Sequence, residues 1–438
     1  MKKVYDVPIY GYMGTIESPM TQNTQENLSE KDRIEEVLTR GVVDIVNRDH
    51  LLNRLTSGDK LRVKFGIDPT GLNVHIGRAS SVRKLLQFQE LGHQIILIIG
   101  DFTATIGDAS DKTESRRMLS REEVFVNEQT YLQQIGKILD ISRAEVRHNS
   151  EWLSKLTPGD WIKLASNFTV QQMISRDNFA ERIKNGVPVG LQEFLYPLAQ
   201  GYDSVMVKSD VEVGGTDQLF NFMAGRKLQE VYGQEPQDIL MIQLLTGTDG
   251  RKMSTSWGNV INILSDPNEK YGRTMSIPDQ LIPVYMEMAT NIPMQRVKEV
   301  ARLIEDGSVN PIELKKELAF EIVRSLDGQK AAEEAAYNFQ RIVQNKEVPD
   351  SQIPIAVVTT DKLEVSTLLN MLKSYNITKS KNEGRRLFEQ GGISVGEAGT
   401  LDSQTTTIDI PEAGLTFRIG KRRFLKIVKE KTGSLNEA

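Results

Sequence analysis

The clearest alternation of apolar and polar side chains lies between Leu61 and Ile67. Apolar residues occupy every second position there, with basic residues and a glycine between them. A period of two residues predicts a β-strand. Residues 68–71, Asp-Pro-Thr-Gly, interrupt the strand with turn-forming residues, and from Arg78 onward the apolar positions recur with helical spacing. The pattern therefore predicts a strand, a polar turn and a helix in succession.

The periodicity of the remaining chain predicts further strands and helices in alternation. The predicted strands are Leu61–Ile67, Gln94–Gly100, Glu145–Arg147, Ser204–Val207, Val211–Val213 and Ile239–Leu245. The predicted helical segments are Ser29–Gly41, Val42–Leu55, Arg78–Gly92, Glu122–Asp140, Trp152–Lys184, Phe194–Tyr202, Gly214–Val231 and Asp279–Gln344. An order of strand, helix, strand, helix, strand predicts an α/β fold with a doubly wound parallel sheet.

These elements group into successive regions. Residues 1–41 are expected to form an N-terminal arm and a helix, and residues 42–260 an α/β domain with a helical insertion at about 115–190. Residues 261–345 are expected to form an all-helical domain. Two prolines within residues 346–365 suggest a linker before the last part of the chain.

Composition excludes several classes of protein. The chain of 438 residues has no Cys, which excludes disulfides and Cys-based zinc sites. It has four His, none paired at metal-ligand spacing, so we expect no protein-held metal. The longest apolar run, Ile95–Ile99, is too short to cross a membrane, and the N-terminus lacks the apolar core of a signal peptide. We therefore expect a cytoplasmic protein without a membrane partner.

Polar loops rich in glycine follow four of the predicted strands, at residues 68–77, 100–116, 214–218 and 247–256. Open α/β sheets bind ligands at the carboxyl ends of their strands. One such loop could be accidental, but four loops that combine Gly with Asp, Thr, Ser or Lys predict a composite site for a nucleotide and a small polar ligand.

The first of these loops ends in His75-Ile76-Gly77, where the predicted helix begins. The free N–H groups and the dipole of a helix N-terminus attract anions. Gly77 has no Cβ, so a flat group can lie against the backbone. An ordinary strand-to-helix turn with an incidental histidine would give the same pattern.

The last of these loops, Gly247–Ser256, places the adjacent cations Arg251 and Lys252 between glycines and hydroxyl residues. A flexible cationic loop can stabilise charge that develops on a transferring phosphate. A solvated basic loop would look the same in isolation. Its occurrence together with His75–Gly77 favours the phosphate interpretation.

Together these segments resemble a known family. HIGR at 75–78 and KMSTS at 252–256 resemble the HIGH and KMSKS motifs of class I aminoacyl-tRNA synthetases. The segments GIDPTGLNVHIG, IGDFTATIGD, FLYPLAQGYDSV and VGGTDQLFN together resemble the tyrosyl-tRNA synthetases, in the bacterial branch with a C-terminal S4 RNA-binding domain. The resemblance covers roughly residues 35–430. It implies a Rossmann-like catalytic domain, a helical anticodon-binding domain at 261–345 and a small α+β S4-like domain at 366–432.

The matching motif positions imply a site for the amino acid. Asp108, Tyr196 and Gln200 would hold the ammonium group. Asp203 would accept a hydrogen bond from the phenol hydroxyl, and Gln218 would contact the carboxylate side of the amino acid.

The same matching implies a site for ATP. The residues expected there are Asp68, Thr70, His75, Gly77, Arg78, Lys112, Arg116, Gly215, Asp217, Lys252 and Thr255. Gly77 would lie under the adenine, and Asp217 with Gly215 would face the ribose. Thr70, His75, Arg78 and Lys252 are the expected catalytic residues, because they would lie at or beside the departing phosphates.

Four positions depart from the family pattern. Arg78 replaces the second His of HIGH, and Thr255 replaces the second Lys of KMSKS. Asp111 stands where the family usually has Gly. Lys64 stands where one branch has a phenol-facing Tyr, although the S4-bearing branch commonly has Lys there, and we expect it at the tyrosine site. The first two departures leave open a weakly catalytic or non-catalytic RNA-binding paralogue.

Basic residues cluster in the last part of the chain. Lys379, Lys381, Arg385 and Arg386 surround a predicted helix, and a second basic stripe near the end contains Lys421, Arg422 and Arg423. Such patches make salt-sensitive contacts to nucleic-acid phosphates. The alternative is a solvated face of a helix and a strand.

The resemblance implies activation of L-tyrosine with ATP to tyrosyl-adenylate, followed by transfer to the 3′ end of tRNA(Tyr). It also implies Mg²⁺ carried with the ATP and a homodimer. The tryptophan enzyme shares the fold and the motifs and remains an alternative, although Asp203 with Tyr202 and Gln200 suits a phenol.

Overall fold

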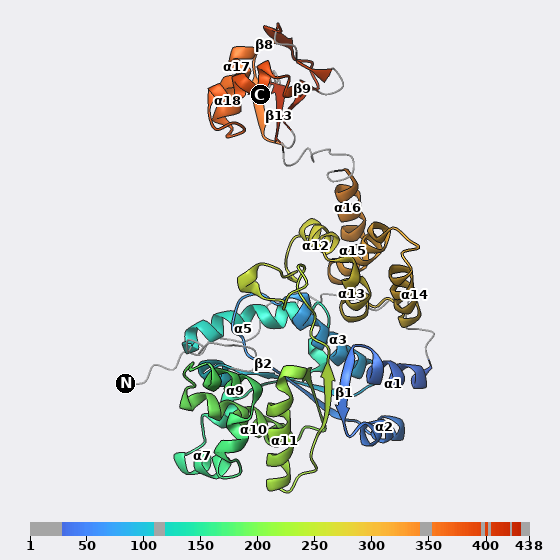
Figure 1. Cartoon of the computed structure of the whole chain (residues 1–438), viewed down its shortest axis with the longest axis vertical. Helices are drawn as coiled ribbons and strands as arrows, with labels where there is room; N and C mark the ends of the chain where they lie inside the picture. Colours follow the sequence, from blue (N-terminus) through green and yellow to red (C-terminus); the bar gives the residue numbers. More distant parts are fainter. Residues whose placement is uncertain are drawn as a thin grey trace, which may run out of the picture. The chain divides into compact units, whose positions relative to one another are not determined.

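The computed structural model of the chain (Figure 1) describes residues 29–108, 119–341, 353–395, 399–401, 404–420 and 423–430. The chain divides into two compact units, residues 1–336 and 337–438. Among the described residues, no helix combines the length and the apolar character that crossing a membrane requires.

A six-stranded sheet with the order β1-β6-β5-β2-β3-β4 forms the centre of the first unit. Its strands are β1 (Val42–Val46), β2 (Arg62–Ile67), β3 (Gln94–Ile99), β4 (Glu145–His148), β5 (Val211–Gly215) and β6 (Asp238–Ile242). Strands β2 to β6 pair in parallel, and β1 runs antiparallel to β6 at one edge. The expected α/β fold with a parallel sheet is confirmed, with one antiparallel strand added.

One helix precedes the first strand, and the others fill the connections between the strands. They are α1 (Glu30–Thr39), α2 (Arg48–Ser57), α3 (Ile76–Glu90), α4 (Thr103–Ile106), α5 (Arg121–Ile135), α6 (Ser150–Leu153), α7 (Pro158–Ala165), α8 (Val170–Ile174), α9 (Asp177–Lys184), α10 (Tyr196–Val207) and α11 (Leu219–Val231). Helices α6 to α9 lie in the part of the chain where the sequence predicts a helical insertion.

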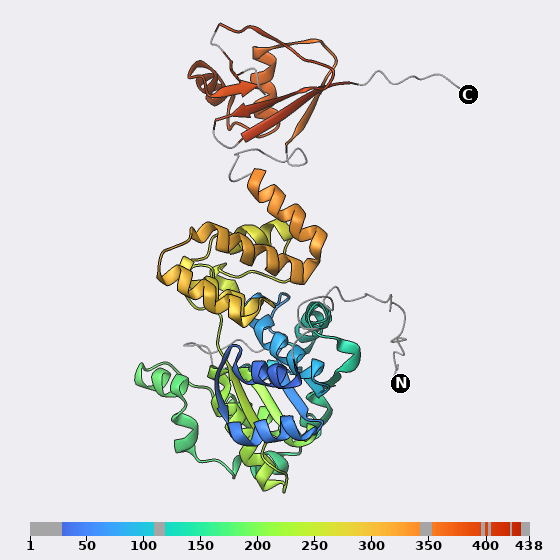
Figure 2. The same ribbon diagram turned by 90° about the vertical axis from the view of Figure 1, so that its right-hand side faces the viewer.

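The sheet is covered on both faces (Figure 2). Ile95 and Leu97 of β3 join the core that contains α3, whereas Ile96 and Ile98 pack with residues of α6 and α10. Alternate side chains of a strand point to opposite faces, so a strand buried on both sides is apolar at every position. This explains why the β3 sequence is a continuous apolar run.

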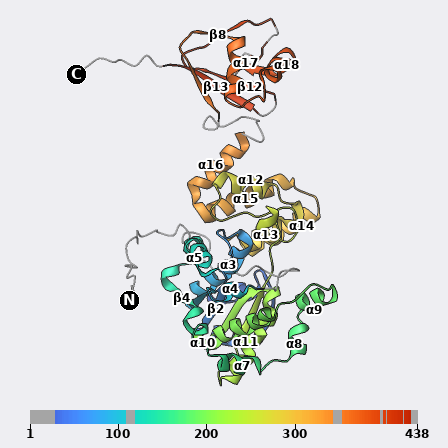
Figure 3. The ribbon, with the colours of Figure 1, turned by 90° about the vertical axis from the view of Figure 1, so that its left-hand side faces the viewer.

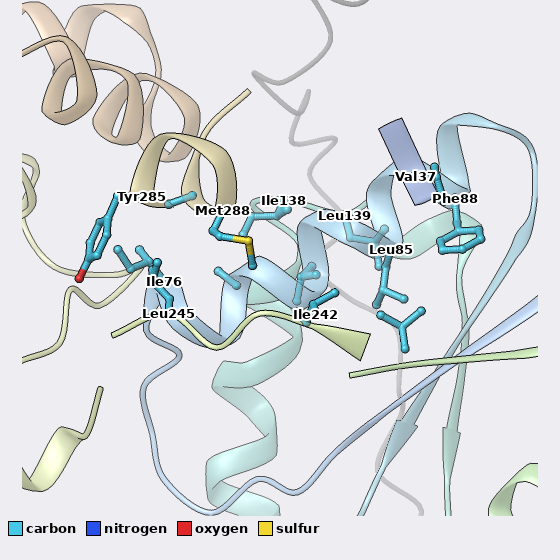
Figure 4. Close-up of a cluster of buried hydrophobic side chains, with 14 of the residues drawn as sticks. Val37, Ile76, Leu85, Phe88, Ile138, Leu139, Ile242, Leu245, Tyr285 and Met288 are labelled. Carbon is cyan, nitrogen blue, oxygen red and sulfur yellow. The ribbon is translucent and has the colours of Figure 1, made fainter. Parts of the chain in front are cut away.

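Helix α3 is held by a core that reaches several elements (Figure 4). Its Leu85 and Phe88 are fully buried, together with Val37 of α1 and Ile242 of β6. At roughly 1.5–3 kcal/mol for each large apolar side chain, this burial fixes the helix firmly against the sheet. The start of α3, which carries the HIGR sequence, is therefore rigidly positioned.

Two predicted elements are wrong. Residues 42–46, expected to be helical, form the strand β1, because their β-branched side chains pair along β6, and helix α2 begins only at Arg48. Residues 204–207, expected to be a strand, form the last turn of α10, where Val205 packs with Leu228 of α11. Short apolar runs fit both helix and strand periodicity, so tertiary packing decides between them.

The first unit continues with helices, as expected for this stretch. They are α12 (Pro267–Met275), α13 (Ile282–Ala289), α14 (Met294–Glu305), α15 (Pro311–Asp327) and α16 (Gln329–Phe339). Leu314, Leu318 and Ile322 of α15 are buried at helical spacing. Arg83 of α3 donates hydrogen bonds to Asn291 and Ser325, which ties this region to the sheet domain.

The second unit is a small α+β structure (Figure 3). Its elements are β7 (Ile355–Val358), β8 (Lys362–Glu364), α17 (Val365–Ser374), α18 (Lys381–Glu389), β9 (Ile393–Val395), β10 (Gly399–Thr400), β11 (Thr407–Asp409), β12 (Leu415–Ile419) and β13 (Arg423–Lys429). Strand β7 pairs in parallel with β13, and β8 pairs with β11. Part of the expected linker therefore consists of strands, since Ala356, Val358 and Leu363 are buried in this core.

Candidate active site

A cavity of about 500 Å³ opens at the carboxyl ends of β2, β3 and β5. The expected site residues that line it are Asp68, Thr70, His75, Gly77, Arg78, Asp108, Tyr196, Gln200, Asp203, Gly215, Asp217, Gln218, Lys252 and Thr255. Lys112 and Arg116, with Asp111, lie outside the described residues. The structure thus brings together loops that are far apart in the sequence.

Asp203, on α10, is the most closely surrounded acid of the cavity. Its side chain is 3% exposed, and it accepts hydrogen bonds from Trp152 Nε1 at 2.7 Å and from Asn149 Nδ2 at 3.2 Å. Burial raises the pKa of Asp203 to about 7, while the Lys64 cation and the two donated hydrogen bonds limit the rise. Asp203 is therefore a fixed acceptor whose charge changes near neutral pH.

The carboxylate of Asp68 joins two elements of the cavity wall. Thr103 Oγ1 donates to one oxygen at 2.7 Å, and the Tyr196 hydroxyl donates to the other at 2.9 Å. Burial, followed by the charge of Asp68, holds the pKa of Tyr196 well above its usual range, so the phenol stays protonated. Gly100 is required nearby, because a Cβ there would overlap the Asp68 carboxylate.

The carboxylate of Asp108 is contacted from two sides. Gln218 Nε2 donates to it at 2.7 Å, and Arg176 Nη2 donates at 3.1 Å. Arg176 lies between α8 and α9, and its guanidinium packs over the rings of Phe179 and Phe220 at 5.3 and 5.8 Å. The helical insertion thus supplies a cation behind an acid of the cavity.

Lys64, which is expected at the tyrosine site, is not among the residues that line the cavity. Its side chain is completely buried and forms an ion pair with Glu212, its partner in the β2–β5 register, at 2.9 Å. Its Nζ also donates to Ser204 Oγ at 2.8 Å and to the Gln200 carbonyl at 2.9 Å. Because β5 and α10 enclose the ammonium group, Lys64 supports the cavity through Gln200.

The amide side chains of the cavity form a connected network. Asn221 Nδ2 donates to Gln200 Oε1 and to Gln218 Oε1, each at 2.9 Å. Gln200 Nε2 donates to Glu212 Oε1 at 3.2 Å. These contacts fix the orientation of both glutamines before any ligand binds.

His75 occupies the N-cap position of α3. Its Nδ1 is buried and lacks a hydrogen-bond partner among the described residues. Burial, with a smaller contribution from Arg78, lowers the pKa of His75 to about 3, so the imidazole is neutral near pH 7. Next to it, a Cβ at Gly77 would lie 2.9 Å from Met253 Sδ of the KMSTS sequence, so a side chain there would separate the two motifs.

The KMSTS loop is held by side chains within it. Asn259 Nδ2 donates to Asp249 at 2.8 Å and to the Lys252 carbonyl at 3.0 Å. Arg251 bonds Asp249 at 2.6 Å and packs over Trp257, and the Asn259 and Arg251 hydrogen bonds lower the pKa of Asp249 to about 2. Of the two adjacent cations, Lys252 lines the cavity and Arg251 is paired outside it.

The second unit carries part of the predicted basic surface. Lys379, Lys381, Arg385 and Arg386 are exposed at and around α18. The guanidinium of Arg423 instead donates to Glu383 at 2.8 Å and to the Ile377 carbonyl at 2.7 Å. Lys421 and Arg422 lie outside the described residues.

Several residues at the cavity or directly behind its wall are not among the site residues predicted from the sequence. They are Thr103, Tyr131, Asn149, Trp152, Arg176 and Glu212. Trp152 and Arg176 belong to the helical insertion, and a lone Trp or Arg on a helix has no recognisable pattern. Asn149 follows β4 directly, and its place after a parallel strand is the one signal that could have suggested it.

Comparisons with known proteins find similar sequences over most of the chain. Residues 56–344 match the family described as tRNA synthetases class I (W and Y). A tyrosine–tRNA ligase of Thermotoga maritima is 45% identical over 91% of this chain and 98% of its own length. A tyrosine–tRNA ligase of Carboxydothermus hydrogenoformans is 46% identical, over 90% of this chain and 98% of its own.

Solved structures share the fold. A tyrosyl-tRNA synthetase from Archaeoglobus fulgidus, complexed with L-tyrosine, superposes with a TM-score of 0.58 at 24% identity, covering 70% of this chain and all of its own. A C-terminally truncated mitochondrial tyrosyl-tRNA synthetase of Aspergillus nidulans gives the same TM-score at 21% identity, over 72% of this chain and 94% of its own.

Proposed function

Because this chain belongs to the class I tRNA synthetase family of the tryptophan and tyrosine enzymes, we propose that its cavity activates tyrosine with ATP and passes it to tRNA. It is an aminoacyl-tRNA ligase, with ATP, tyrosine and tRNA as substrates. The observation that supports tyrosine most directly is the buried Asp203, which Trp152 and Asn149 hold as an acceptor at the cavity.

The first step forms a bond between a carboxylate oxygen of tyrosine and the α-phosphorus of ATP. The bond from that phosphorus to the bridging oxygen breaks, and its electron pair leaves with pyrophosphate. A terminal ribose hydroxyl of tRNA then attacks the tyrosyl carbonyl, its proton is released, and AMP departs. Positioning and charge stabilisation, rather than covalent chemistry by the protein, provide the acceleration.

On the amino-acid side, we assign Asp203 to the phenol hydroxyl. The ammonium is assigned to Asp108, Tyr196 and Gln200, and Gln218 to the carboxylate side. The contacts that hold these side chains from behind support the assignment. Lys64 is assigned a supporting position beneath Gln200.

On the nucleotide side, Asp68, Gly77, Gly215 and Asp217 are assigned to the nucleoside, and Thr70, His75, Arg78, Lys252 and Thr255 to the phosphates. Lys112 and Arg116 remain part of this proposal through the family resemblance alone. Mg²⁺ is proposed to arrive with ATP. Among the described residues, no group of three or more His, Asp or Glu side chains could hold a metal ion.

The two alternatives are not favoured. Relatives at 45 and 46% identity over most of the chain are tyrosine–tRNA ligases rather than tryptophan enzymes. A non-catalytic paralogue would not need to keep His75 and Lys252 at one cavity.

The test is ATP–pyrophosphate exchange, measured with tyrosine, with tryptophan and without an amino acid. We expect exchange with tyrosine only. Exchange with tryptophan at an equal rate would assign the cavity to the other enzyme of the family, and no exchange with any amino acid would favour the paralogue.

The second unit is proposed to bind tRNA through the exposed cations around α18. A truncation after residue 341, which removes this unit with its strands β7 and β8, should leave adenylate formation intact. Charging of tRNA should weaken, and the logarithmic salt dependence of tRNA binding should become shallower by about 0.7–0.9 for each phosphate that the truncated chain no longer neutralises. An unchanged salt dependence in the truncated chain would contradict the proposal.

We also propose that the chain forms a homodimer and acts in the cytoplasm. The helical insertion exposes Ile162, Val170 and Ile183, and Leu191 follows them with 83% of its surface exposed. Apolar side chains gathered on one segment are typical of a subunit interface. Sedimentation of the intact chain and of a Val170→Asp variant tests this: dimers are expected only for the intact chain.

A further inference from the structure

The structure reveals a contact between Arg78 and Tyr131 that the motifs do not show. Arg78 Nη1 donates a hydrogen bond to the Tyr131 hydroxyl at 2.6 Å, and both residues line the cavity. Arginine N–H groups only donate, so the phenol oxygen is the acceptor and its own proton is left to donate elsewhere. The residues that the structure describes provide no acceptor for that proton.

Tyr131 is held rigidly in place. It is 1% exposed and belongs to the main hydrophobic core. On the same face of α5, Asn127 Nδ2 donates to the Pro69 carbonyl at 2.9 Å, and Thr130 Oγ1 donates to the Leu72 carbonyl at 2.8 Å. Residues three and four apart share a helix face. This face of α5 is therefore bonded to the loop that leads into His75, and the Tyr131 hydroxyl is fixed relative to that loop.

A second residue of α5 strengthens this attachment. Gln134 Nε2 donates to the Leu72 carbonyl at 2.9 Å, and Gln134 Oε1 accepts from the Val74 N–H at 2.7 Å. The side chain of Gln134 is completely buried. The loop, the helix and the Tyr131 hydroxyl thus form one connected unit at the cavity wall.

We infer that Arg78 and Tyr131 act as one donor pair for the phosphate oxygens of ATP, which makes Tyr131 a further catalytic residue of the proposed reaction. Arg78 supplies a positive charge and its remaining N–H groups, and Tyr131 supplies a neutral O–H. A hydroxyl that accepts from a cation becomes a stronger donor. The role of this hydroxyl is to donate a hydrogen bond to the charge that leaves with pyrophosphate.

The pair also accounts for the two departures from the family motifs. Thr255 brings no charge to the loop where the family has a second Lys. An arginine at position 78 can contact both Tyr131 and a phosphate oxygen, because its planar guanidinium carries five N–H donors. A shorter neutral side chain at that position would offer fewer donors and no permanent charge.

Single-turnover formation of adenylate tests the inference in Tyr131→Phe, Arg78→Ala and the double variant. Tyr131→Phe removes one oxygen and keeps the buried ring. We expect it to slow adenylate formation by about 10- to 100-fold, as for the loss of one hydrogen bond to a charged group, with unchanged tyrosine binding. The double variant should be within about twofold of Arg78→Ala, because the two side chains act as one unit.

Tyr271→Phe is the matched control. Tyr271, on α12, is 2% exposed and does not line the cavity. Its substitution also removes the hydroxyl of a buried tyrosine, and we expect a rate within about twofold of the parent. A parent-like rate in Tyr131→Phe, or a double variant that shows the product of the two single effects, would overturn the donor pair. So would weaker tyrosine binding together with a lower Tm in Tyr131→Phe.

Two probes show whether the Arg78–Tyr131 pair contacts the phosphates or the nucleoside of ATP. Inorganic tripolyphosphate and adenosine each carry one part of ATP and serve as competitors, and Tyr131→Phe should weaken inhibition by tripolyphosphate while leaving that by adenosine unchanged. The reverse result would place the pair at the nucleoside and overturn the inference. Tripolyphosphate binding can be followed by calorimetry even if the parent forms no adenylate, so a failure of the proposed function is distinguishable from a failure of the pair.

Discussion

The amino-acid side and the nucleotide side of the cavity differ in how firmly hydrogen bonds and burial within the protein hold their side chains. On the amino-acid side, Asp203 and Asp108 each receive hydrogen bonds from other side chains of the cavity region. On the nucleotide side, Lys252 and Thr255 are exposed on a loop, and the buried His75 Nδ1 has no partner among the described residues.

This difference follows from what each side has to recognise. A small hydroxyl or ammonium group is distinguished by a few hydrogen bonds, so their acceptors must be fixed in advance. Charge on the phosphates changes during the reaction, and donors that act mainly in the transition state raise the rate without tightening substrate binding. Four predictions test the contrast.

The largest effect is expected on the amino-acid side, in discrimination against phenylalanine. Phenylalanine has no hydroxyl and would leave Asp203 without its proposed ligand. The ratio of kcat/KM for tyrosine over phenylalanine in exchange should be about 10⁴–10⁵, a range that is already known for a tyrosyl-tRNA synthetase. Similar values for the two amino acids would mean that Asp203 does not select the hydroxyl.

The next effect concerns the nucleotide side. Lys252→Ala should reduce the rate of adenylate formation by about 10²–10³, in line with losing one donor to developing charge, while the Kd for tyrosine stays constant. Arg251→Ala is the matched control, since Arg251 is paired with Asp249 outside the cavity, and it should lose much less. Equal losses in the two variants would show that general loop charge, rather than Lys252, is required.

A smaller effect is expected in the pH dependence of ligand binding, which should differ between the amino-acid side and the nucleotide side. The pKa of Asp203 is raised to about 7, chiefly by burial, so this acid gains a proton as the pH falls through 7. The Kd for tyrosine should then rise by up to about tenfold per pH unit below 7. Trp152→Phe removes a hydrogen bond that favours the ionised form, so the onset should move to higher pH.

His75 provides the contrast within the same experiment. Its pKa of about 3 means that it remains neutral from pH 5 to 9. Binding of ATP should therefore show no break from this histidine over that range. Isothermal titration with tyrosine and with ATP at several pH values measures both sides, and a pH-independent Kd for tyrosine would contradict the contrast.

The smallest effect is expected from Thr255→Lys. This variant restores the second cation of the family motif at a position that lines the cavity. The Arg78–Tyr131 pair already supplies donors nearby, so adenylate formation should rise by no more than a few-fold or stay the same. A decrease in the single-turnover rate would show that the loop no longer accommodates a lysine.

The two sides of the cavity differ in how much of their surroundings the local sequence could indicate. His75, Gly77 and Lys252 lie in short contiguous segments with turn, helix-start and charge signals, and the structure brings them to one cavity. The partners of Asp203 come from Asn149 and Trp152, at least 51 residues away in the chain. No local period encodes such contacts, because tertiary packing creates them.

The errors in the predicted fold have a similar origin. The strand β1 pairs with β6, almost two hundred residues later in the chain, and without that partner its apolar residues fit a helix equally well. Lys64 is expected at the tyrosine site through the family resemblance, and its ion pair with Glu212 on the neighbouring strand could not be predicted from the local sequence. Pairing with residues far away in the sequence thus determines both the conformation of β1 and the surroundings of Lys64.

The way Asp203 is held also limits how the substrate range of this scaffold could be redesigned. Replacing Asp203 by an apolar residue, to admit an amino acid without a hydroxyl, would leave the Trp152 N–H and an Asn149 amide proton without their acceptor. Each buried donor left unsatisfied costs about 1–3 kcal/mol. A variant library should therefore change positions 149, 152 and 203 together, because selection at position 203 alone would mostly recover poorly folded proteins.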